Sequence, residues 1–157
     1  MLGSGLRNTR PGYSVILDEL LVGEYPTLAD IAWLAETASV RAVLSLQDEA
    51  DLLSKALDAA KLAAEYARHG IEFRRVPIQD GDPGALAARL DTAVGTLHEL
   101  LGRCGRVYLH CNAGYNRAPT VAIGYLHRHR GLSLDDACGF VKARRACLPY
   151  MSVFGGF

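Results

Sequence analysis

The sequence predicts an α/β fold: a single domain with a central, mostly parallel sheet flanked by helices. Short runs of β-branched and apolar residues alternate along the chain with longer stretches of helical periodicity. The length of 157 residues is that of one domain with its own hydrophobic core. We expect a flexible amino-terminal segment over residues 1–12 and one folded domain over residues 13–157.

Strands and helices are expected to alternate in the amino-terminal half. Residues 15–22 predict strand structure, and Thr27 is expected to begin a helix because its side chain can cap the first turn. The apolar run 41–46 predicts the next strand. Residues 48–69 carry leucines on one side and predict a single long helix that ends at Gly70.

The carboxyl-terminal half continues the alternation. Residues 71–78 predict a strand, and an apolar stripe over residues 86–101 predicts a helix. Residues 107–111 predict a buried strand, which a loop and two closing helices follow. Because ligands bind at the carboxyl ends of strands in such sheets, the residues that follow these strands are the first candidates for a site.

The composition narrows the possible functions. The 17 basic and 17 acidic residues balance, so the overall charge gives no reason to expect nucleic-acid or membrane binding. The four cysteines are scattered, with no disulfide framework and no paired zinc ligands, and we expect neither a metal nor a cofactor. No secretory leader or membrane-length apolar run is found, so we expect a cytoplasmic protein without a membrane anchor.

The segment HCNAGYNR, residues 110–117, carries the most specific chemical signal. Cys111 and Arg117 are separated by five residues at a strand-to-helix junction, where backbone N–H groups and the helix dipole can converge on an oxyanion. Cys138 and Arg144 have the same spacing, but they lie in a segment of helical periodicity. The spacing alone is therefore a weak signal, and the strand–loop–helix context is what distinguishes Cys111.

The residue types in this loop predict the capture and transfer of phosphate or another oxyanion. Cys111 would be a thiolate nucleophile, and Arg117 would bind two phosphate oxygens and stabilise charge in the transition state. His110 would orient the loop through its backbone or help to hold the thiolate, and a purely structural role is equally expected. The expected substrate-binding residues are Asn112, Ala113, Gly114, Tyr115, Asn116 and Arg117.

The pattern His-Cys-x-x-Gly-x-x-Arg resembles the signature of the cysteine-dependent protein tyrosine phosphatase superfamily. Tyr115, Pro119 and Thr120 resemble its dual-specificity branch. Residues 16–23 with the following 26–27 resemble that family's first hairpin and helix start, and residues 43–47 resemble its next core strand. The resemblance implies a phosphatase catalytic domain over residues 13–157. It also implies hydrolysis of a phosphorylated protein or another phosphomonoester through a phosphocysteine.

Such a mechanism needs a proton donor for the leaving oxygen, and two upstream residues are candidates. Asp82 precedes Pro83 and a helical stripe, so it is expected at the N-cap of that helix. Asp80 is left in the preceding loop, where the family pattern places the general acid. We therefore expect Asp80 to be the general acid.

Ala118 departs from the family pattern, because many members have serine or threonine there, and that hydroxyl assists breakdown of the phosphoenzyme. Thr120 lies elsewhere on the helix and is not expected to substitute, so we expect slow dephosphorylation of Cys111. The string Arg-Ala-Pro also resembles plant glucan phosphatases related to laforin. Those enzymes favour glycine where this chain has Asn116, and Gly81 stands where an aromatic residue could stack on sugar.

Several functions remain open from the residues alone. A dual-specificity protein phosphatase is the leading hypothesis, and a glucan or phosphoinositide phosphatase on the same fold is the alternative. A catalytically weak phosphate-binding pseudophosphatase module is disfavoured by the intact set of Cys111, Arg117 and Asp80. A sulfurtransferase or arsenate reductase is disfavoured by Asp80 and by the position of Gly114.

Other basic residues give weaker signals. The pairs Arg74–Arg75 and Arg144–Arg145 could enlarge an anionic pocket, but adjacent charges most often form a solvated face. We therefore expect both pairs on the surface. Tyr115 is expected either to line the entrance of the cleft or to pack.

Overall fold

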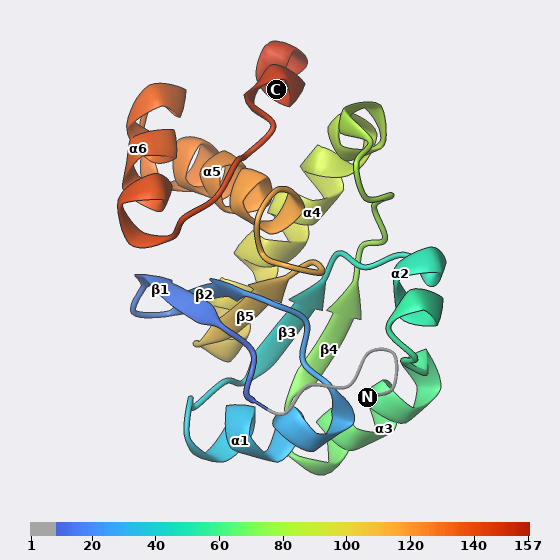
Figure 1. Cartoon of the computed structure of the whole chain (residues 1–157). Helices are drawn as coiled ribbons and strands as arrows, with labels where there is room; N and C mark the ends of the chain where they lie inside the picture. The colour runs from blue at the N-terminus through green and yellow to red at the C-terminus, as the bar shows by residue number, and fades with distance from the viewer. Residues whose placement is uncertain (1–8) are drawn as a thin grey trace.

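The computed structural model describes residues 9–157 and has a five-stranded sheet at its centre (Figure 1). The strands lie in the order β1-β2-β5-β3-β4 and span β1 (Tyr13–Leu17), β2 (Leu20–Gly23), β3 (Ala42–Ser45), β4 (Glu72–Arg75) and β5 (Val107–His110). β1 and β2 form an antiparallel hairpin, and all other neighbouring strands are parallel. The predicted α/β fold is confirmed, with a sheet that is mixed because of this hairpin.

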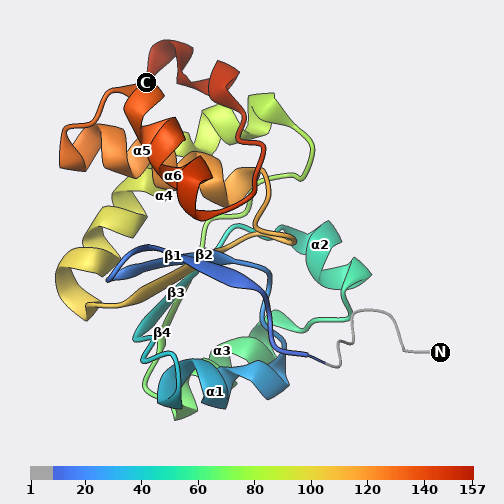
Figure 2. The same cartoon turned by 60° about the vertical axis from the view of Figure 1, so that its left-hand side comes forward.

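Helices cover both faces of the sheet (Figures 1 and 2). One face carries α1 (Ile31–Glu36) and α3 (Ala59–Arg68), and the other carries α4 (Pro83–Cys104), α5 (Arg117–Arg130) and α6 (Leu134–Arg144). The alternation of side chains along each strand feeds two cores. In β5, for example, Val107 and Leu109 pack with the α4–α5–α6 layer, whereas Tyr108 packs with the α1–α3 layer. The central strand β5 is therefore covered on both sides.

The amino-terminal segment is described from residue 9, so residues 1–8 of the segment expected to be flexible lie outside the described residues. Arg10 donates to the carbonyl oxygen of Ala29 at 2.8 Å and pairs with Asp30 at 3.2 Å. Asp30 belongs to the short 3-10 helix η1 (Leu28–Asp30), which leads into α1. Arg10 therefore attaches the start of the described chain to this turn.

The prediction of one long helix over residues 48–69 is wrong. The segment divides into α2 (Glu49–Ser54) and α3, and Ala56 between them adopts a φ of 55°. The physical reason is a second helix start, because Asp48 and Asp58 each accept a hydrogen bond from the N–H group three residues ahead. The division lets the short helix α2 stand at the carboxyl end of the sheet.

The strand predicted over residues 107–111 is present but ends one residue earlier, since β5 ends at His110. α5 begins at Arg117, so residues 111–116 form the connecting loop. Asp82 caps α4 by accepting the N–H of Ala85 at 3.0 Å, and Cys138 lies within α6. The chain closes with the 3-10 helix η2 (Met151–Gly156), and over residues 9–157 no helix is long and apolar enough to span a bilayer.

Candidate active site

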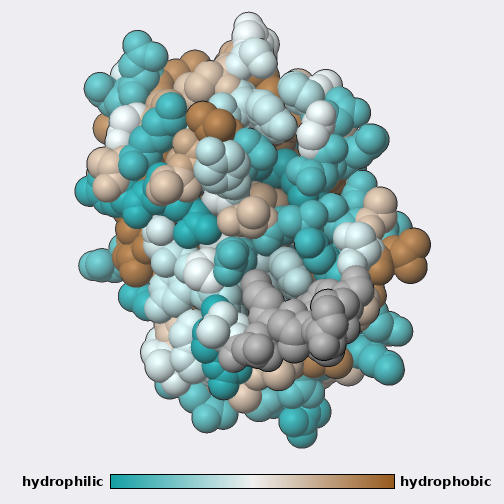
Figure 3. All heavy atoms as spheres, viewed as in Figure 1, coloured by the Kyte–Doolittle hydropathy of each residue, from teal (hydrophilic) through white to brown (hydrophobic). Residues whose placement is uncertain are grey.

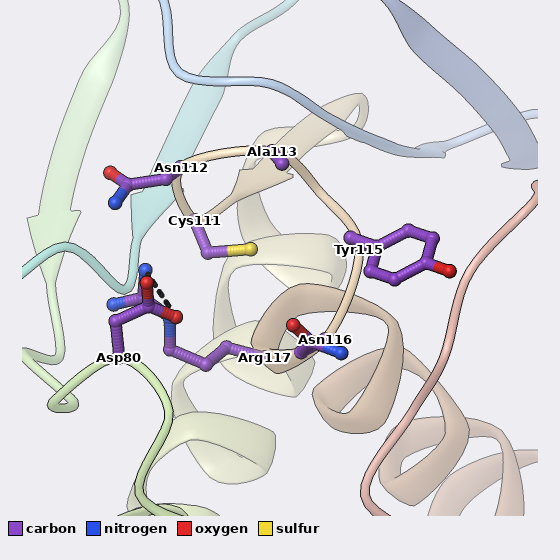
Figure 4. A pocket seen from close by; sticks show the side chains of 7 residues that line it. All are labelled: Asp80, Cys111, Asn112, Ala113, Tyr115, Asn116 and Arg117. Carbon is purple, nitrogen blue, oxygen red and sulfur yellow. Dashed lines mark ion pairs between the residues drawn. The ribbon is translucent and has the colours of Figure 1, made fainter.

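The strand-to-helix junction after β5 surrounds a small cavity of about 150 Å³ (Figure 4). It is lined by Asp80, Cys111, Asn112, Ala113, Tyr115, Asn116 and Arg117. Of the predicted substrate-binding residues, only Gly114 does not line this cavity. We call residues 111–117 the Cys111 loop. Its cavity has the size of a phosphate group rather than of a whole ligand, because pockets for small molecules usually measure about 300–1,000 Å³.

The backbone carbonyl groups of the Cys111 loop are held from outside. The Asn112 carbonyl oxygen accepts the Tyr25 N–H at 3.0 Å, and the Arg145 guanidinium donates to the carbonyl oxygens of Ala113 at 3.1 Å and Gly114 at 2.7 Å. The Tyr115 carbonyl oxygen accepts the Leu148 N–H at 2.8 Å, and the Asn116 carbonyl oxygen accepts the Thr120 hydroxyl at 2.7 Å. The donors come from the segment after β2, from α5 and from the segment after α6. The whole loop is therefore fixed by three separate parts of the fold.

The same hydrogen bonds decide where the N–H groups of the loop point. In a trans peptide the C=O and the following N–H are antiparallel, so a carbonyl held outside turns the next N–H toward the cavity. The described part of the chain offers no acceptor to the N–H groups of residues 112–117. They stand at the N-terminus of the 14-residue helix α5, whose dipole adds positive potential. Convergent N–H groups in this position bind an anion.

Gly114 is required by the path of the loop. Its φ is +64°, and a Cβ there would lie 2.7 Å from the carbonyl oxygen of Gly23 and 2.7 Å from an Arg145 nitrogen. A side chain at this position would therefore push the loop away from β2 in addition to straining the backbone. The glycine that the sequence placed in the loop serves the approach of the loop to β2, and not the lining of the cavity.

Arg117 is buried, with only 1% of its surface exposed. Its Nη1 donates to the Asp51 carboxylate at 2.7 Å and to the Ile78 carbonyl oxygen at 2.8 Å, while its Nη2 lies 3.4 Å from Asp80. Its buried Nε has no hydrogen-bond partner among the described residues. Burial lowers the pKa of Arg117, but the hydrogen bond to Asp51 and the nearby acidic groups outweigh it, so the pKa is raised. Hydrogen bonds from Nη1 therefore hold the charged guanidinium in place, and Nε is left to donate to another acceptor.

Asp51 is the residue of this site that the sequence did not reveal. It lies on α2, is 5% exposed, and accepts hydrogen bonds from Arg117 and from the Asn112 amide at 2.8 Å. Burial raises the pKa of Asp51. The hydrogen bonds from Arg117 and the Asp48 N–H, together with the charge of Arg117, lower it by more, so the pKa lies below its usual value. The signal that could have revealed Asp51 is the Asp48-x-x-Asp51 pattern, which is typical of a helix start and indicates that a short helix begins soon after β3.

Gln47 extends this brace to the start of α2. Its side-chain amide donates to the Asn112 side-chain oxygen at 2.8 Å, and Gln47 is 1% exposed. Asn112 therefore uses its side chain to connect the Cys111 loop to the segment after β3, while its backbone contributes to the cavity. The sequence suggested only the second of these roles.

The two aspartates upstream of the loop have separate positions. Asp80 stands at the mouth of the cavity with 55% of its side chain exposed, facing Arg117 (Figure 4). Asp82 is occupied as the N-cap of α4. His110 is buried, and its Nδ1 lies 2.9 Å from the carbonyl oxygen of Cys111, which is a backbone contact of the kind expected for an orienting residue.

The residue that follows Arg117 is buried and has no hydroxyl group. Ala118 is fully buried in the first turn of α5, and Thr120, two residues further on, is fully buried as well. The Thr120 hydroxyl donates to the Asn116 carbonyl oxygen and accepts the Tyr150 N–H at 2.9 Å. The hydroxyl is therefore engaged in holding the loop and the carboxyl-terminal segment together.

The expectation that both arginine pairs lie on the surface is wrong for Arg145. Arg144 is exposed and its guanidinium carbon lies 3.4 Å from the centre of the Phe140 ring, whereas Arg145 is half-buried and hydrogen-bonded to the Cys111 loop. Arg74 and Arg75 form ion pairs with acidic residues, and Arg75, with 21% of its side chain exposed, also donates to the Gln47 carbonyl oxygen at 3.1 Å. Among the described residues, no group of three or more His, Cys, Asp or Glu side chains could hold a metal ion.

A mixed α/β sheet with a cysteine loop at a strand-to-helix junction is an arrangement suited to binding phosphate. Residues 22–154 match the family model described as dual specificity phosphatase, catalytic domain, and the chain belongs to that family. The chain is 31% identical over 140 residues, 87% of its length, to the amyloplastic phosphoglucan phosphatase DSP4 of Castanea sativa. It is 31% identical over 85 residues, 54% of its length, to dual specificity protein phosphatase 1 of Homo sapiens.

The likeness extends to solved structures. A crystal structure of PTPMT1 in complex with PI(5)P superposes with a TM-score of 0.76 and 22% sequence identity, over 90% of this chain and 88% of that one. The chain spans 37% of the length of the Castanea sativa relative and 23% of the human one. The likeness to these relatives therefore concerns a catalytic domain within longer proteins.

Proposed function

We propose that this chain hydrolyses phosphomonoesters through a phosphocysteine intermediate on Cys111. The observation that supports it best is the Cys111 loop, in which the held carbonyl groups of residues 112–116 turn the N–H groups of residues 113–117 toward a cavity that Arg117 also lines, with its buried Nε unpartnered among the described residues. A phosphoryl group has three oxygens that need donors, and this ring supplies them around the cysteine sulfur. The buried cation adds charge where the transition state gains it.

The first step transfers the phosphoryl group to the cysteine. The Cys111 Sγ attacks phosphorus, the bond from phosphorus to the leaving oxygen breaks, and Asp80 gives its proton to that oxygen. Asp80 is suited to this role because it lies at the open mouth of the cavity, where the leaving group must stand. Arg117 binds two oxygens of the transferred group.

The second step hydrolyses the phosphocysteine and regenerates the free enzyme. Water attacks the phosphorus of the phosphocysteine, the sulfur–phosphorus bond breaks, and Asp80 accepts the proton of the water. We propose that this step is slow, because Ala118 offers no hydroxyl to the sulfur and the Thr120 hydroxyl is bonded to Asn116 and Tyr150. Phosphoenzyme should therefore accumulate.

The substrate that we propose first is a phosphorylated protein, as in the dual-specificity branch. The cavity takes the phosphoryl group alone, so the rest of the substrate would lie across the surrounding surface. On the face seen in Figure 3, hydrophobic residues are scattered among hydrophilic ones. A mixed surface of this kind suits a hydrogen-bonding substrate better than an apolar one.

A phosphoglucan is the second candidate, and two observations favour it. The match to the phosphoglucan phosphatase of Castanea sativa covers 87% of the chain, against 54% for the human protein phosphatase. Arg117, Ala118 and Pro119 also reproduce the Arg-Ala-Pro string of the plant branch. Asn116 and Gly81 weigh against it. A phosphoinositide is the third possibility on the same fold.

The reaction is tested with 4-nitrophenyl phosphate as a generic substrate and vanadate as an inhibitor. We expect hydrolysis, inhibition by vanadate, and loss of hydrolysis in Cys111→Ser. Cys138→Ser is the matched control, because Cys138 and Arg144 have the same spacing inside a helix, and it should keep its activity. An inactive protein that still binds phosphate would support a pseudophosphatase module, and turnover of thiosulfate would support a sulfurtransferase.

The substrate class is tested with a panel of a phosphotyrosine peptide, a phosphothreonine peptide, a phosphoinositide and a solubilised phosphoglucan. The measured quantity is the relative kcat/KM, since discrimination between substrates is a ratio of these values. The protein phosphatase proposal predicts the highest value for a peptide. The highest value for phosphoglucan would replace it with the second candidate.

A further inference from the structure

Arg145 makes three hydrogen bonds that connect the Cys111 loop to two other parts of the fold. Its Nε donates to the Gly114 carbonyl oxygen at 2.7 Å, and its Nη2 donates to the Ala113 carbonyl oxygen at 3.1 Å. Its Nη1 donates to the Ser14 hydroxyl on β1 at 3.1 Å. All three nitrogens of one planar group are thus used, two of them on consecutive carbonyls of the loop.

These two carbonyls belong to the peptide groups whose N–H bonds are those of Gly114 and Tyr115. Because the C=O and N–H of a trans peptide are antiparallel, holding both oxygens on the Arg145 side turns these N–H groups to the opposite side. That side is the cavity beside Cys111. The positive guanidinium also polarises both peptide groups, which makes their N–H bonds stronger donors.

We propose that Arg145 is a positioning residue for phosphate capture, and that it acts by orienting and polarising the N–H groups of Gly114 and Tyr115. The inference rests on the proposed function, since it concerns the same cavity. Arg145 touches neither the sulfur nor the cavity, so it acts through the loop and not on the substrate. The residues that follow it strengthen the same connection.

Residues 145–150, which we call the strap, run along the outside of the Cys111 loop (Figure 1). The Leu148 N–H donates to the Tyr115 carbonyl oxygen at 2.8 Å, and the Leu148 carbonyl oxygen accepts the Asn116 side-chain amide at 2.6 Å. The strap therefore holds the carbonyls of three of the seven loop residues, Ala113, Gly114 and Tyr115. Arg145 is the one side chain of the strap that does so among the described residues.

Arg144 gives a matched comparison inside the same chain. It has the same charge and is one residue away, but it donates to the Phe140 carbonyl oxygen at 2.9 Å and lies over the Phe140 ring. Any effect of general positive charge near the site should therefore be shared by both arginines. An effect of orienting the loop should belong to Arg145 alone.

The experiment compares Arg145→Gln, Arg145→Lys and Arg144→Gln in the full chain, with inorganic phosphate as the probe. For Arg145→Gln we expect kcat on 4-nitrophenyl phosphate to fall about 10–100-fold, since losing one well-placed oxyanion donor costs about 10²–10³-fold. We also expect the inhibition constant for phosphate to rise about tenfold. Arg145→Lys should be intermediate, because an ammonium cannot span two carbonyls. Arg144→Gln should stay within about twofold of wild type.

A readout on the loop separates positioning from simple stabilisation. In wild type, the amide signals of Gly114 and Tyr115 should shift in NMR spectra when phosphate is added, and these shifts should shrink in the Arg145 variants. Rates are expressed per folded molecule, and Arg145→Lys decides the matter if Arg145→Gln does not fold.

Two results would overturn the inference. One is an Arg145 variant that keeps kcat and phosphate inhibition within about twofold of wild type. The other is an equal loss in Arg144→Gln. Failure of the proposed function itself looks different, because the wild-type chain would then neither hydrolyse 4-nitrophenyl phosphate nor be inhibited by phosphate.

Discussion

Asp51→Asn is expected to destabilise the protein and impair the site together. The substitution keeps the size of the side chain but removes the negative charge that faces Arg117 at 2.7 Å, where both side chains are at most 7% exposed. It also places an amide N–H₂ where a carboxylate oxygen accepts hydrogen bonds from Arg117, Asn112 or the Asp48 N–H. The buried Arg117 then keeps only the more distant and 55% exposed Asp80, at 3.4 Å, as a paired carboxylate.

The expected loss of unfolding free energy is about 3 kcal/mol. Breaking a buried ion pair by removing one partner costs about 3–5 kcal/mol, and the lower end applies because asparagine keeps one accepting oxygen. For a domain of this size each kcal/mol lowers Tm by about 2–4 °C, which gives a decrease of roughly 6–12 °C. Because Arg117 loses its brace, kcat should also fall by about 10–100-fold.

The free energy is measured by urea unfolding of wild type and variant at several pH values. The pKa of Asp51 is lower in the folded protein than in the unfolded chain, so its carboxylate stabilises the fold above about pH 3.9. This contribution is lost as the pH falls through the folded pKa. The difference between wild type and variant should therefore be complete at pH 7 and shrink below about pH 4.

The matched control is Asp58→Asn. Asp58 is likewise an aspartate at a helix start, where as the N-cap of α3 it accepts the Lys61 N–H at 3.0 Å, but it is exposed and pairs with no buried cation among the described residues. Asparagine is an equally good N-cap, so the loss should be below about 0.5 kcal/mol. A loss below about 1 kcal/mol for Asp51→Asn, or one equal to that of the control, would refute the reasoning.

Further predictions concern the chemistry and the loop. Asp80→Asn should lower kcat for phenyl phosphate about 10²–10³-fold and leave the unfolding free energy unchanged. Asp82→Asn should change neither kcat nor the unfolding free energy, because asparagine is an equivalent N-cap. Equal effects of the two substitutions in steady-state assays would contradict the assignment of Asp80. Wild type should release a rapid burst of 4-nitrophenol before a slower steady rate, and Ala118→Ser should reduce the burst and raise kcat; stopped-flow traces that are linear from the first turnover would argue against slow dephosphorylation. Gly114→Ala should lower phosphate affinity at least tenfold, because its Cβ would collide with Gly23; unchanged inhibition by phosphate would show that the loop does not depend on this approach.

Most of the fold could be predicted because its signals are local. The helix start at Asp82, the strand that ends at His110 and the helical setting of Cys138 follow from residues within a few positions of each other. The prediction of a single helix over residues 48–69 was wrong because it relied on the local leucine pattern, which continues past a second helix start at Asp58. Hydrophobic periodicity does not reveal the end of one helix when the next helix continues the same apolar face.

The partners of the loop could not be predicted, because they are distant in sequence. Asp51 lies 66 positions from Arg117, and Arg145 lies 31 positions from Gly114. Nothing local distinguishes Arg145 from its neighbour Arg144. The turn of the chain after α6 decides which of the two reaches the Cys111 loop.

The sequence by itself determined the family pattern of this protein: a cysteine and an arginine around a glycine-bearing loop between a strand and a helix, with an aspartate after an earlier strand. Those features are local, because a loop needs its own glycine and a helix its own cap. The tertiary structure alone decided how the loop is held, through Tyr25, Asp51 and Arg145. The reason is that a carbonyl must be satisfied by whatever donor the fold brings beside it, and that donor leaves no mark near the motif.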